Sequence, residues 1–219
     1  MDSALVEFVD SPNHKALKEN LAKQMPIIDK FFQNTNNLFM DREKVLFELT
    51  FCLCTPQSKA VYCRDAVMRM KMSGLLMKGT KEQILNYMQG VRFNEKKSDY
   101  IIKAWSEFDA IYNSIIQLKD NPRSLREWLC ENITGYGMKE ASHFLRNIGL
   151  GKDLAILDVH IMRELNQFGL TQQTTGGMPK KAYIEMEKRF ESLAKALNMS
   201  IAELDCTIWL TRSGSGELM

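Results

Sequence analysis

Apolar residues recur every three or four positions along almost the whole chain, a spacing that places them on one face of an α-helix. One such series, in the middle of the chain, is Ile101, Trp105, Phe108, Tyr112 and Ile115. Another, near the end, is Tyr183, Met186, Phe190, Leu193 and Leu197. No segment alternates apolar and polar residues over the length of a β-strand. The spacing predicts an all-α protein in which each series is the buried stripe of one amphipathic helix.

Side chains suited to starting a helix stand in front of several of these segments. Two pairs have the spacing of a capping box, in which a hydroxyl and an amide or carboxyl group satisfy each other's backbone donors. They are Thr80 with Gln83 and Ser200 with Glu203. Asp41 and Asn121 each fit the residue just before a helix, and Asn121 is followed by a proline, which favours the first helical position.

The length of 219 residues, with 45% hydrophobic residues, allows one large domain or two small lobes. No linker of low complexity divides the chain, so we expect residues 1–219 to form a single unit of two interlocked helical lobes with a cleft between them. The longest apolar run, Leu49 to Thr55, is far too short to cross a membrane. Five scattered cysteines and the lack of a signal-like segment favour the cytoplasm.

The overall charge does not indicate a polyanionic partner, because the chain has 29 basic and 27 acidic residues and hence a net charge of only +2. A nucleic-acid function would need a local site. One local basic cluster contains Arg92, Lys96, Lys97 and Lys103. This pattern is typical both of a phosphate contact and of an ordinary charged helix face. Cys52 and Cys54 have no second ligand pair at metal-binding spacing, so we expect no metal site.

The segment from about residue 124 to 148 has the pattern of two helices joined by a Gly-x-Gly turn. Gly135 and Gly137 allow a sharp turn whose N–H groups can approach a phosphate at the positive start of the second helix. Such a turn can equally be a plain connector. Lys139 lies in the first turn of that second helix, where the helix end favours the uncharged, nucleophilic amine. Asp158 follows an apolar run and fits the N-cap of a later helix.

These residues carry a specific resemblance. The segments Ile133-Thr-Gly-Tyr-Gly-Met-Lys139 and Leu157-Asp-Val-His160 resemble the signature of helix–hairpin–helix (HhH-GPD) DNA glycosylases, and the Lys/Asp pair resembles their bifunctional glycosylase/lyase branch. Three further segments resemble the archaeal-type 8-oxoguanine DNA glycosylase/AP lyases: residues 51–60, 91–100 and 139–149. Thr134 stands where many relatives have proline, and Met219 where relatives commonly end in lysine.

The resemblance implies an enzyme that excises 8-oxoguanine from double-stranded DNA and cleaves the strand at abasic sites, without metal or organic cofactor. Lys139 would attack C1′ and form a Schiff base, and Asp158 would stabilise positive charge on the sugar. Gly135, Gly137 and His143 would contact the DNA backbone, although His143 also fits a solvated helix face. We expect a cytoplasmic, nucleoid-associated monomer.

The resemblance also implies how the damaged base is held. Phe93 and Trp209 would sandwich the flipped base, and the terminal carboxylate of Met219 would read its protonated N7. For Phe93 and Trp209 the alternative is core packing, which is the commoner fate of aromatic residues. Gln57 would probe the gap left in the duplex, or else is a polar residue at a helix end.

Two other functions remain open from the sequence. One is a glycosylase/lyase for a different oxidised base, such as a pyrimidine. Related pyrimidine-specific enzymes often hold an iron–sulfur cluster with four cysteines near the C-terminus, where this chain has only Cys206. The other is a non-catalytic module that holds DNA by its hairpin, for which Lys139 would be dispensable.

Overall fold

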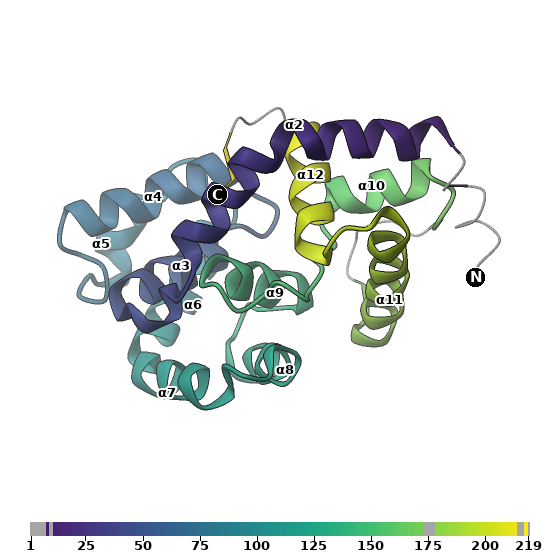
Figure 1. Cartoon of the computed structure of the whole chain (residues 1–219). Coiled ribbons are helices and arrows are strands. Elements are labelled where there is room, and N and C mark those ends of the chain that lie inside the picture. The colour runs from purple at the N-terminus through teal and green to yellow at the C-terminus, as the bar shows by residue number, and fades with distance from the viewer. Residues whose placement is uncertain (1–7, 9–10, 173–177, 214–216, 219) are drawn as a thin grey trace. The chain divides into compact units, whose positions relative to one another are not determined.

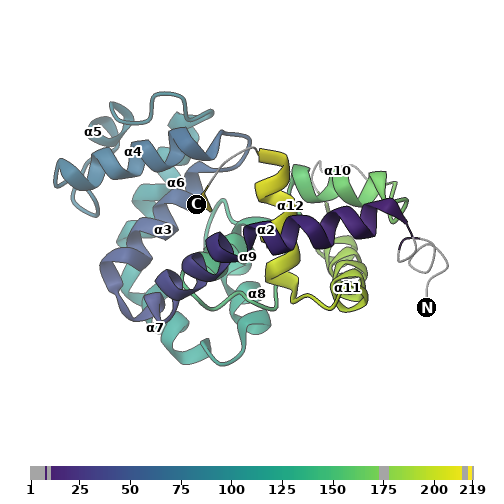
Figure 2. The same cartoon turned by 45° about the horizontal axis from the view of Figure 1, so that its top comes forward.

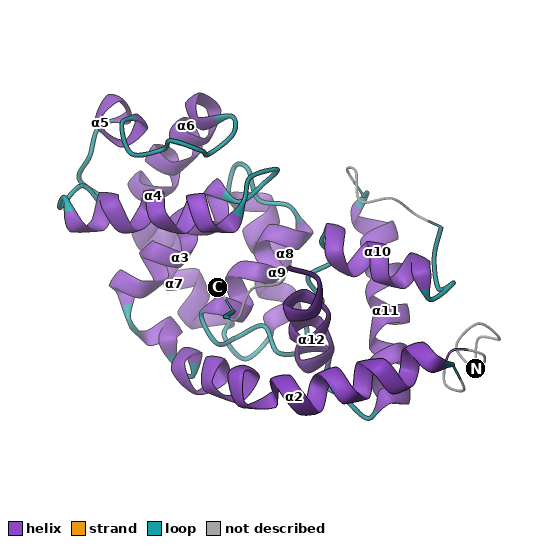
Figure 3. Cartoon of the chain, turned by 90° about the horizontal axis from the view of Figure 1, so that it is seen from above, coloured by secondary structure: helices purple, strands orange, loops and turns teal. Residues whose placement is uncertain are grey.

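The computed structural model describes Phe8 and residues 11–172, 178–213 and 217–218. Throughout these residues every regular element is a helix, as Figure 3 shows, which confirms the all-α prediction for this part of the chain. The elements are α2 (Pro12–Thr35), the 3-10 helix η1 (Leu38–Met40), α3 (Arg42–Cys54), α4 (Ala60–Met72), α5 (Lys81–Leu85), α6 (Asn94–Ser106), α7 (Phe108–Leu118), α8 (Pro122–Asn132), α9 (Met138–Asn147), α10 (Val159–Gln167), α11 (Lys180–Leu197) and α12 (Ile201–Ser213).

The chain divides into two compact units (Figure 1). One unit is continuous, spans residues 36–151 and contains η1 and helices α3 to α9. The other combines residues 1–35 with 152–219 and contains α2 and helices α10 to α12. The predicted cleft between two lobes stays a prediction.

Helix α3 is the centre of the 36–151 unit. Every residue from Val45 to Cys54 is buried, because α4, α6 and α9 pack around this helix (Figure 2). The apolar run noted in the sequence is therefore the interior half of a core helix. The same helix also buries Glu48, which accepts a hydrogen bond of 2.8 Å from Asn147 Nδ2 and lies 3.9 Å from the Arg64 guanidinium. Burial raises the pKa of Glu48, against the opposing charge of Arg64.

The series from Ile101 to Ile115 does not form one helix, so that prediction is wrong. Helix α6 ends at Ser106 and α7 begins at Phe108. The Ser106 hydroxyl donates to the carbonyl of Lys103, and Glu107 leaves the helical conformation with φ −102° and ψ 6°. A serine hydroxyl that bonds within the last turn competes with helix continuation. Because the break is so short, both helices keep their buried stripes.

The predicted helix starts are confirmed. Thr80 and Gln83 form a complete capping box before α5, and Ser200 and Glu203 exchange hydrogen bonds of 2.7 and 3.2 Å before α12. The side chains of Asp41 and Asn121 accept from the first turns of α3 and α8. The series from Tyr183 to Leu197 is the buried face of α11, also as predicted.

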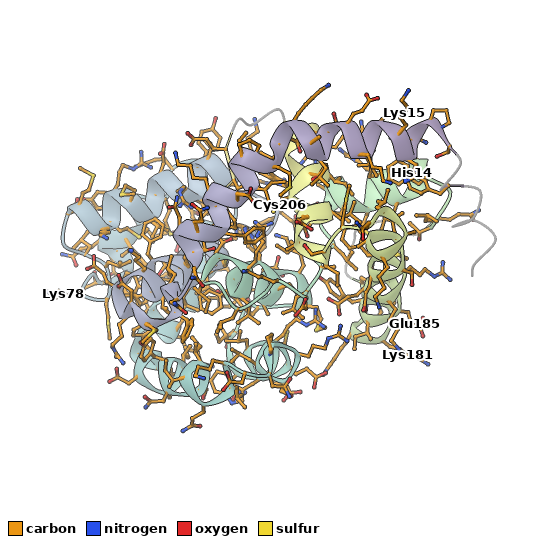
Figure 4. The ribbon with its side chains drawn as sticks, in the orientation of Figure 1. His14, Lys15, Lys78, Lys181, Glu185 and Cys206 are labelled. Atoms are coloured by element: carbon orange, nitrogen blue, oxygen red, sulfur yellow. The ribbon has the colours of Figure 1, made fainter. Side chains whose placement is uncertain are left out.

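In the other unit, α12 packs against α2, α10 and α11. Cys206 of α12, labelled in Figure 4, is buried with Ile28 and Leu210. None of the five cysteines, all of which lie in the described residues, forms a disulfide, and only Cys130 is partly exposed. Among the described residues, no helix has the length and apolar character needed to cross a membrane.

Candidate functional site

The turn between α8 and α9 is a tight hairpin that requires glycine at residue 135. Gly135 has φ +96°, and a Cβ atom there would lie 2.5 Å from Cδ2 of Tyr100. The positive φ and the aromatic ring beneath it each exclude a side chain. The hairpin backbone therefore rests directly on α6.

Two further side chains anchor the hairpin. The Tyr136 hydroxyl donates to the Leu49 carbonyl over 3.1 Å, which pins the turn to buried helix α3. Lys103 Nζ of α6 donates to Thr134 Oγ1 over 3.0 Å. Thr134 lacks the fixed backbone of a proline, and the Lys103 contact supplies a restraint from outside the turn.

Helix α9 starts without a side-chain cap of its own. Its N-cap is Gly137, which has no side chain to accept a hydrogen bond from the first turn. The first-turn N–H groups and the positive end of the helix dipole are the features that bind anions at helix starts. Gly135 and Gly137 thus lie where the sequence predicts them, and their contact with DNA stays a prediction.

Lys139 lies in the first turn of α9, as predicted. Its side chain is 26% exposed, and Nζ lies 3.5 Å from Oε1 of the neighbouring Glu140. Cys52 of α3 lies within electrostatic reach. Burial raises the pKa of the Cys52 thiol well above its ordinary value, and the charge of Lys139 opposes that shift. The thiol is therefore protonated at neutral pH, and the role of Lys139 as the nucleophile stays a prediction.

His143 follows Lys139 by one helical turn. It is half-buried, and its ring meets the ring of Phe51 edge-on with centroids 5.7 Å apart. This contact directs one side of the imidazole toward α3, so the fully solvated face allowed by the sequence does not describe His143. Its predicted contact with the DNA backbone stays a prediction.

Gln57 and Phe93 lie in two neighbouring loops of the same unit, and both have left-handed backbones, with φ of 55° and 57°. Left-handed residues other than glycine are uncommon, and they concentrate at functional sites. Phe93 is 55% exposed, which excludes core packing for this ring, and the Arg92 guanidinium lies 5.4 Å from its centroid. Gln57 is also exposed.

Asp158 is the N-cap of α10, as the sequence predicts. One carboxylate oxygen, Oδ1, accepts from the backbone N–H groups of His160 and Ile161 over 2.8 and 2.9 Å. The segment before it is held by buried side chains from α11 and α12. Glu187 accepts from Ala155 N, and Asp205 accepts from Ile156 N. The carboxylate of Asp158 is therefore rigidly placed, and its role in catalysis stays a prediction.

Trp209 is half-buried and packs against the cluster of Ile28, Cys206 and Leu210. Part of the indole thus serves the core of its unit, and base stacking by the remainder stays a prediction. Met219, the predicted reader of the damaged base, lies outside the described residues.

Sequence reasoning missed several residues that shape this region. Lys97 is 5% exposed, so it does not belong to a solvated basic cluster with Arg92, Lys96 and Lys103. The missed signal is its position on the buried stripe of α6, four residues before Ile101. Glu140, Tyr100 and Tyr136 were also missed. Among the described residues, no group of three or more histidine, cysteine or acidic side chains is arranged to hold a metal ion.

Comparison with known proteins identifies the family. A family model described as 8-oxoguanine DNA glycosylase matches residues 28–199. The 8-oxoguanine DNA glycosylase/AP lyase of Aquifex aeolicus is 39% identical over 184 residues, which cover 80% of each chain.

Two solved structures are also similar. The 8-oxoguanine DNA glycosylase of Thermotoga maritima has a TM-score of 0.82 at 29% identity, covering 94% of this chain and 98% of that one. The Methanocaldococcus jannaschii 8-oxoguanine glycosylase/lyase, solved with 15mer DNA containing 8-oxoguanine, has a TM-score of 0.78 at 30% identity, covering 91% and 98%.

The all-α fold and the glycine hairpin with its first-turn lysine define the class as a helix–hairpin–helix DNA glycosylase. Within that class, the chain belongs to the 8-oxoguanine DNA glycosylase family.

Proposed function

We propose that this protein excises 8-oxoguanine from double-stranded DNA and then cleaves the strand at the resulting abasic site. The observation that carries the proposal is the placement of Lys139 in the first turn of α9, directly after the glycine hairpin. A DNA phosphate held by the hairpin would bring a sugar within reach of this amine. We further propose that the protein acts in the cytoplasm at the nucleoid, where this substrate is found.

The chemistry begins with the uncharged amine of Lys139 attacking C1′ of the damaged nucleotide. The bond from C1′ to the base breaks, and its electron pair leaves with the base. Asp158 stabilises the positive charge that develops on the sugar and accepts the proton that the attacking amine loses. Opening of the sugar ring then gives a Schiff base. Loss of a proton from C2′ expels the 3′ phosphate, which cleaves the strand.

Base recognition requires the nucleotide to leave the helical stack. Phe93 supports this step because its exposed ring offers a stacking face beside the Arg92 cation. Gln57 is exposed in the adjacent loop and is suited to fill the gap that the extruded base leaves. We propose Trp209 as the second stacking partner. The proposed bond-making and bond-breaking steps are carried out by side chains of this chain, without a metal ion or organic cofactor.

The test is covalent trapping with borohydride, which reduces a Schiff base to a stable adduct. The wild-type protein is incubated with duplexes containing 8-oxoguanine, thymine glycol or an abasic site. We expect adducts with the 8-oxoguanine and abasic duplexes, and none with any duplex for Lys139→Gln. An adduct with thymine glycol but not with 8-oxoguanine would support the pyrimidine alternative. Binding without an adduct on any duplex would indicate a non-catalytic module.

A further inference from the structure

Lys97 is almost completely buried, yet it keeps all three of its ammonium donors occupied. Nζ donates to the carbonyl of Cys54 over 2.6 Å, to the carbonyl of Pro56 over 2.7 Å and to Ser58 Oγ over 3.0 Å. An ammonium group has three N–H donors and is costly to bury unless each of them finds an acceptor. Burial lowers the pKa of Lys97, so the charge is kept there against a desolvation cost.

The acceptors of Lys97 surround one residue of the proposed site. Pro56 and Ser58 stand immediately before and after Gln57, and both bond to the same ammonium group. Gln57 itself is exposed and has a left-handed backbone, a conformation that persists only where neighbouring structure enforces it. The contacts of Lys97 supply that enforcement from inside the protein.

The same group of bonds reaches the loop that carries Phe93. The backbone N–H of Lys97 donates to the Phe93 carbonyl over 3.0 Å, which closes the first turn of α6. Ser58 Oγ also accepts from the backbone N–H of Arg92 over 2.9 Å. Phe93 is the second exposed residue here with a left-handed backbone. The side chain of Lys97 therefore bonds to both residues that flank Gln57, and the Ser58 hydroxyl that it contacts also holds the backbone of Arg92, next to Phe93.

We infer that Lys97 is a positioning residue that, with Ser58, fixes Gln57 and Phe93 relative to one another before DNA binds. The inference rests on the proposed function, in which Gln57 fills the gap in the duplex and Phe93 stacks on the extruded base. Two surface residues preassembled in this way lose less conformational entropy when they engage a flipped nucleotide. The role concerns extrusion and capture of a base, a step that an abasic site does not need.

The functional test compares two reactions of the same protein under single-turnover conditions. Excision of 8-oxoguanine needs Gln57 and Phe93, whereas strand cleavage at a ready-made abasic site needs mainly Lys139. For Lys97→Met we expect excision to slow about tenfold, since misplacement by about an ångström can cost that much or more. Cleavage at the abasic site should stay within about twofold of wild type. Equal losses in both reactions, or no loss in either, would overturn the inference.

Matched variants separate positioning from a general loss of fold. Ser58→Ala removes one acceptor of Lys97, so it should also slow excision more than cleavage at the abasic site, by a smaller factor. Lys97→Arg should recover part of the excision rate. The control is Lys81→Met, which removes surface ion pairs to Glu95 and Asp99 of α6 and should leave both rates unchanged. Adding Gln57→Ala to Lys97→Met should slow excision by no more than about a further twofold, because both changes remove the same function, the correct placement of Gln57. A fully additive double variant would contradict the shared role.

Hydrogen exchange tests, without any measurement of activity, whether Lys97 holds the loops that carry Gln57 and Phe93. In Lys97→Met, amide exchange should accelerate in residues 54–60 and 91–94 and stay at the wild-type rate in α7. Unchanged exchange in those two loops would overturn the inference even if excision slows. If wild-type protein fails to excise 8-oxoguanine at all, the proposed function fails, and the exchange rates alone decide whether Lys97 holds the two loops.

Discussion

Two helix starts in this protein are built in opposite ways. Helix α10 begins at Asp158, whose carboxylate accepts from two first-turn N–H groups and so neutralises the positive end of the helix from within the chain. Helix α9 begins at Gly137, which has no side chain to do the same. The start of α10 is thus capped by the side chain of its own N-cap residue, whereas the start of α9 has no such cap and carries only the first-turn carboxylate of Glu140.

The segments that lead into the two helices are also anchored in different ways. Before Asp158, the backbone N–H groups of Ala155 and Ile156 are occupied by the buried carboxylates of Glu187 and Asp205. At the hairpin, the anchoring hydrogen bonds are made by side chains, through the Tyr136 hydroxyl and Thr134 Oγ1. The segment before Asp158 is thus fixed through its backbone N–H groups, and the hairpin that we propose to contact a phosphate is fixed through its side chains.

The largest expected effect comes from separating the two functions of Asp158. Asp158→Asn keeps a good N-cap but removes the negative charge, so excision of 8-oxoguanine should fall about 100-fold while thermal stability changes little. Asp158→Ala should lose the same activity and also about 1 kcal/mol of stability. Single-turnover excision and thermal melting of both variants make the comparison. If Asp158→Asn retains full activity, the carboxylate serves only as a cap.

The next effect concerns the close fit of the hairpin on α6. Gly135→Ala forces a residue with a Cβ into φ +96° and into the ring of Tyr100, so we expect a loss of about 2–4 kcal/mol in unfolding free energy. Gly74→Ala is the matched control, because Gly74 has φ +69° but nothing within 4 Å of its added Cβ. That variant should lose only about 1–2 kcal/mol. Equal losses in urea unfolding would show that Tyr100 yields to the added methyl.

A cap added to α9 would convert one helix start into the other. Gly137 has φ −110°, which any residue can adopt, and its added Cβ would meet only the movable carboxylate of Glu140. Gly137→Ser should stabilise the fold by a few tenths of a kcal/mol and weaken binding to undamaged duplex roughly threefold. Melting temperature and fluorescence anisotropy measure the two effects. Gains in both stability and affinity would contradict the view that this helix end is kept open for phosphate.

The smallest expected effect concerns Glu48, a buried carboxylate in the 36–151 unit. Burial raises the pKa of Glu48 above its ordinary value of 4.5. At pH values between the ordinary and the raised pKa, the folded protein therefore binds more protons than the unfolded chain. The contribution of Glu48 to stability should therefore decline as the pH rises through that window. Urea unfolding of wild type and Glu48→Gln across pH 4.5–7 should show a flatter dependence for the variant. Parallel curves would show that Glu48 does not contribute to the pH dependence of stability.

Much of the fold could be predicted because it is encoded locally. Capping boxes such as Thr80 with Gln83, and stripes such as that of α11, depend on residues a few positions apart. The break at Glu107 could not be predicted in this way, because the two short helices on either side preserve the same apolar spacing. The carboxylates of Glu187 and Asp205 act on backbone groups far away in sequence, and no local pattern reveals such pairings.

The candidate site divides along the same line. The hairpin glycines, Lys139 and Asp158 were predictable from spacing and from the chemistry of helix starts. Lys97 was missed, because a lysine within a basic segment is normally a surface residue. Its place on the buried stripe of α6 was the available signal, but its acceptors, at the end of α3 and in the loop that follows, are distant in sequence.

Lys139, in the first turn of α9, is the residue that we propose forms the covalent intermediate with the sugar. The most direct measurement is to trap the wild-type protein with borohydride on the 8-oxoguanine duplex, digest the adduct and identify the modified peptide by mass spectrometry. We expect the sugar remnant on Lys139 alone. A remnant on another lysine, such as Lys97 or Lys152, would contradict the claim.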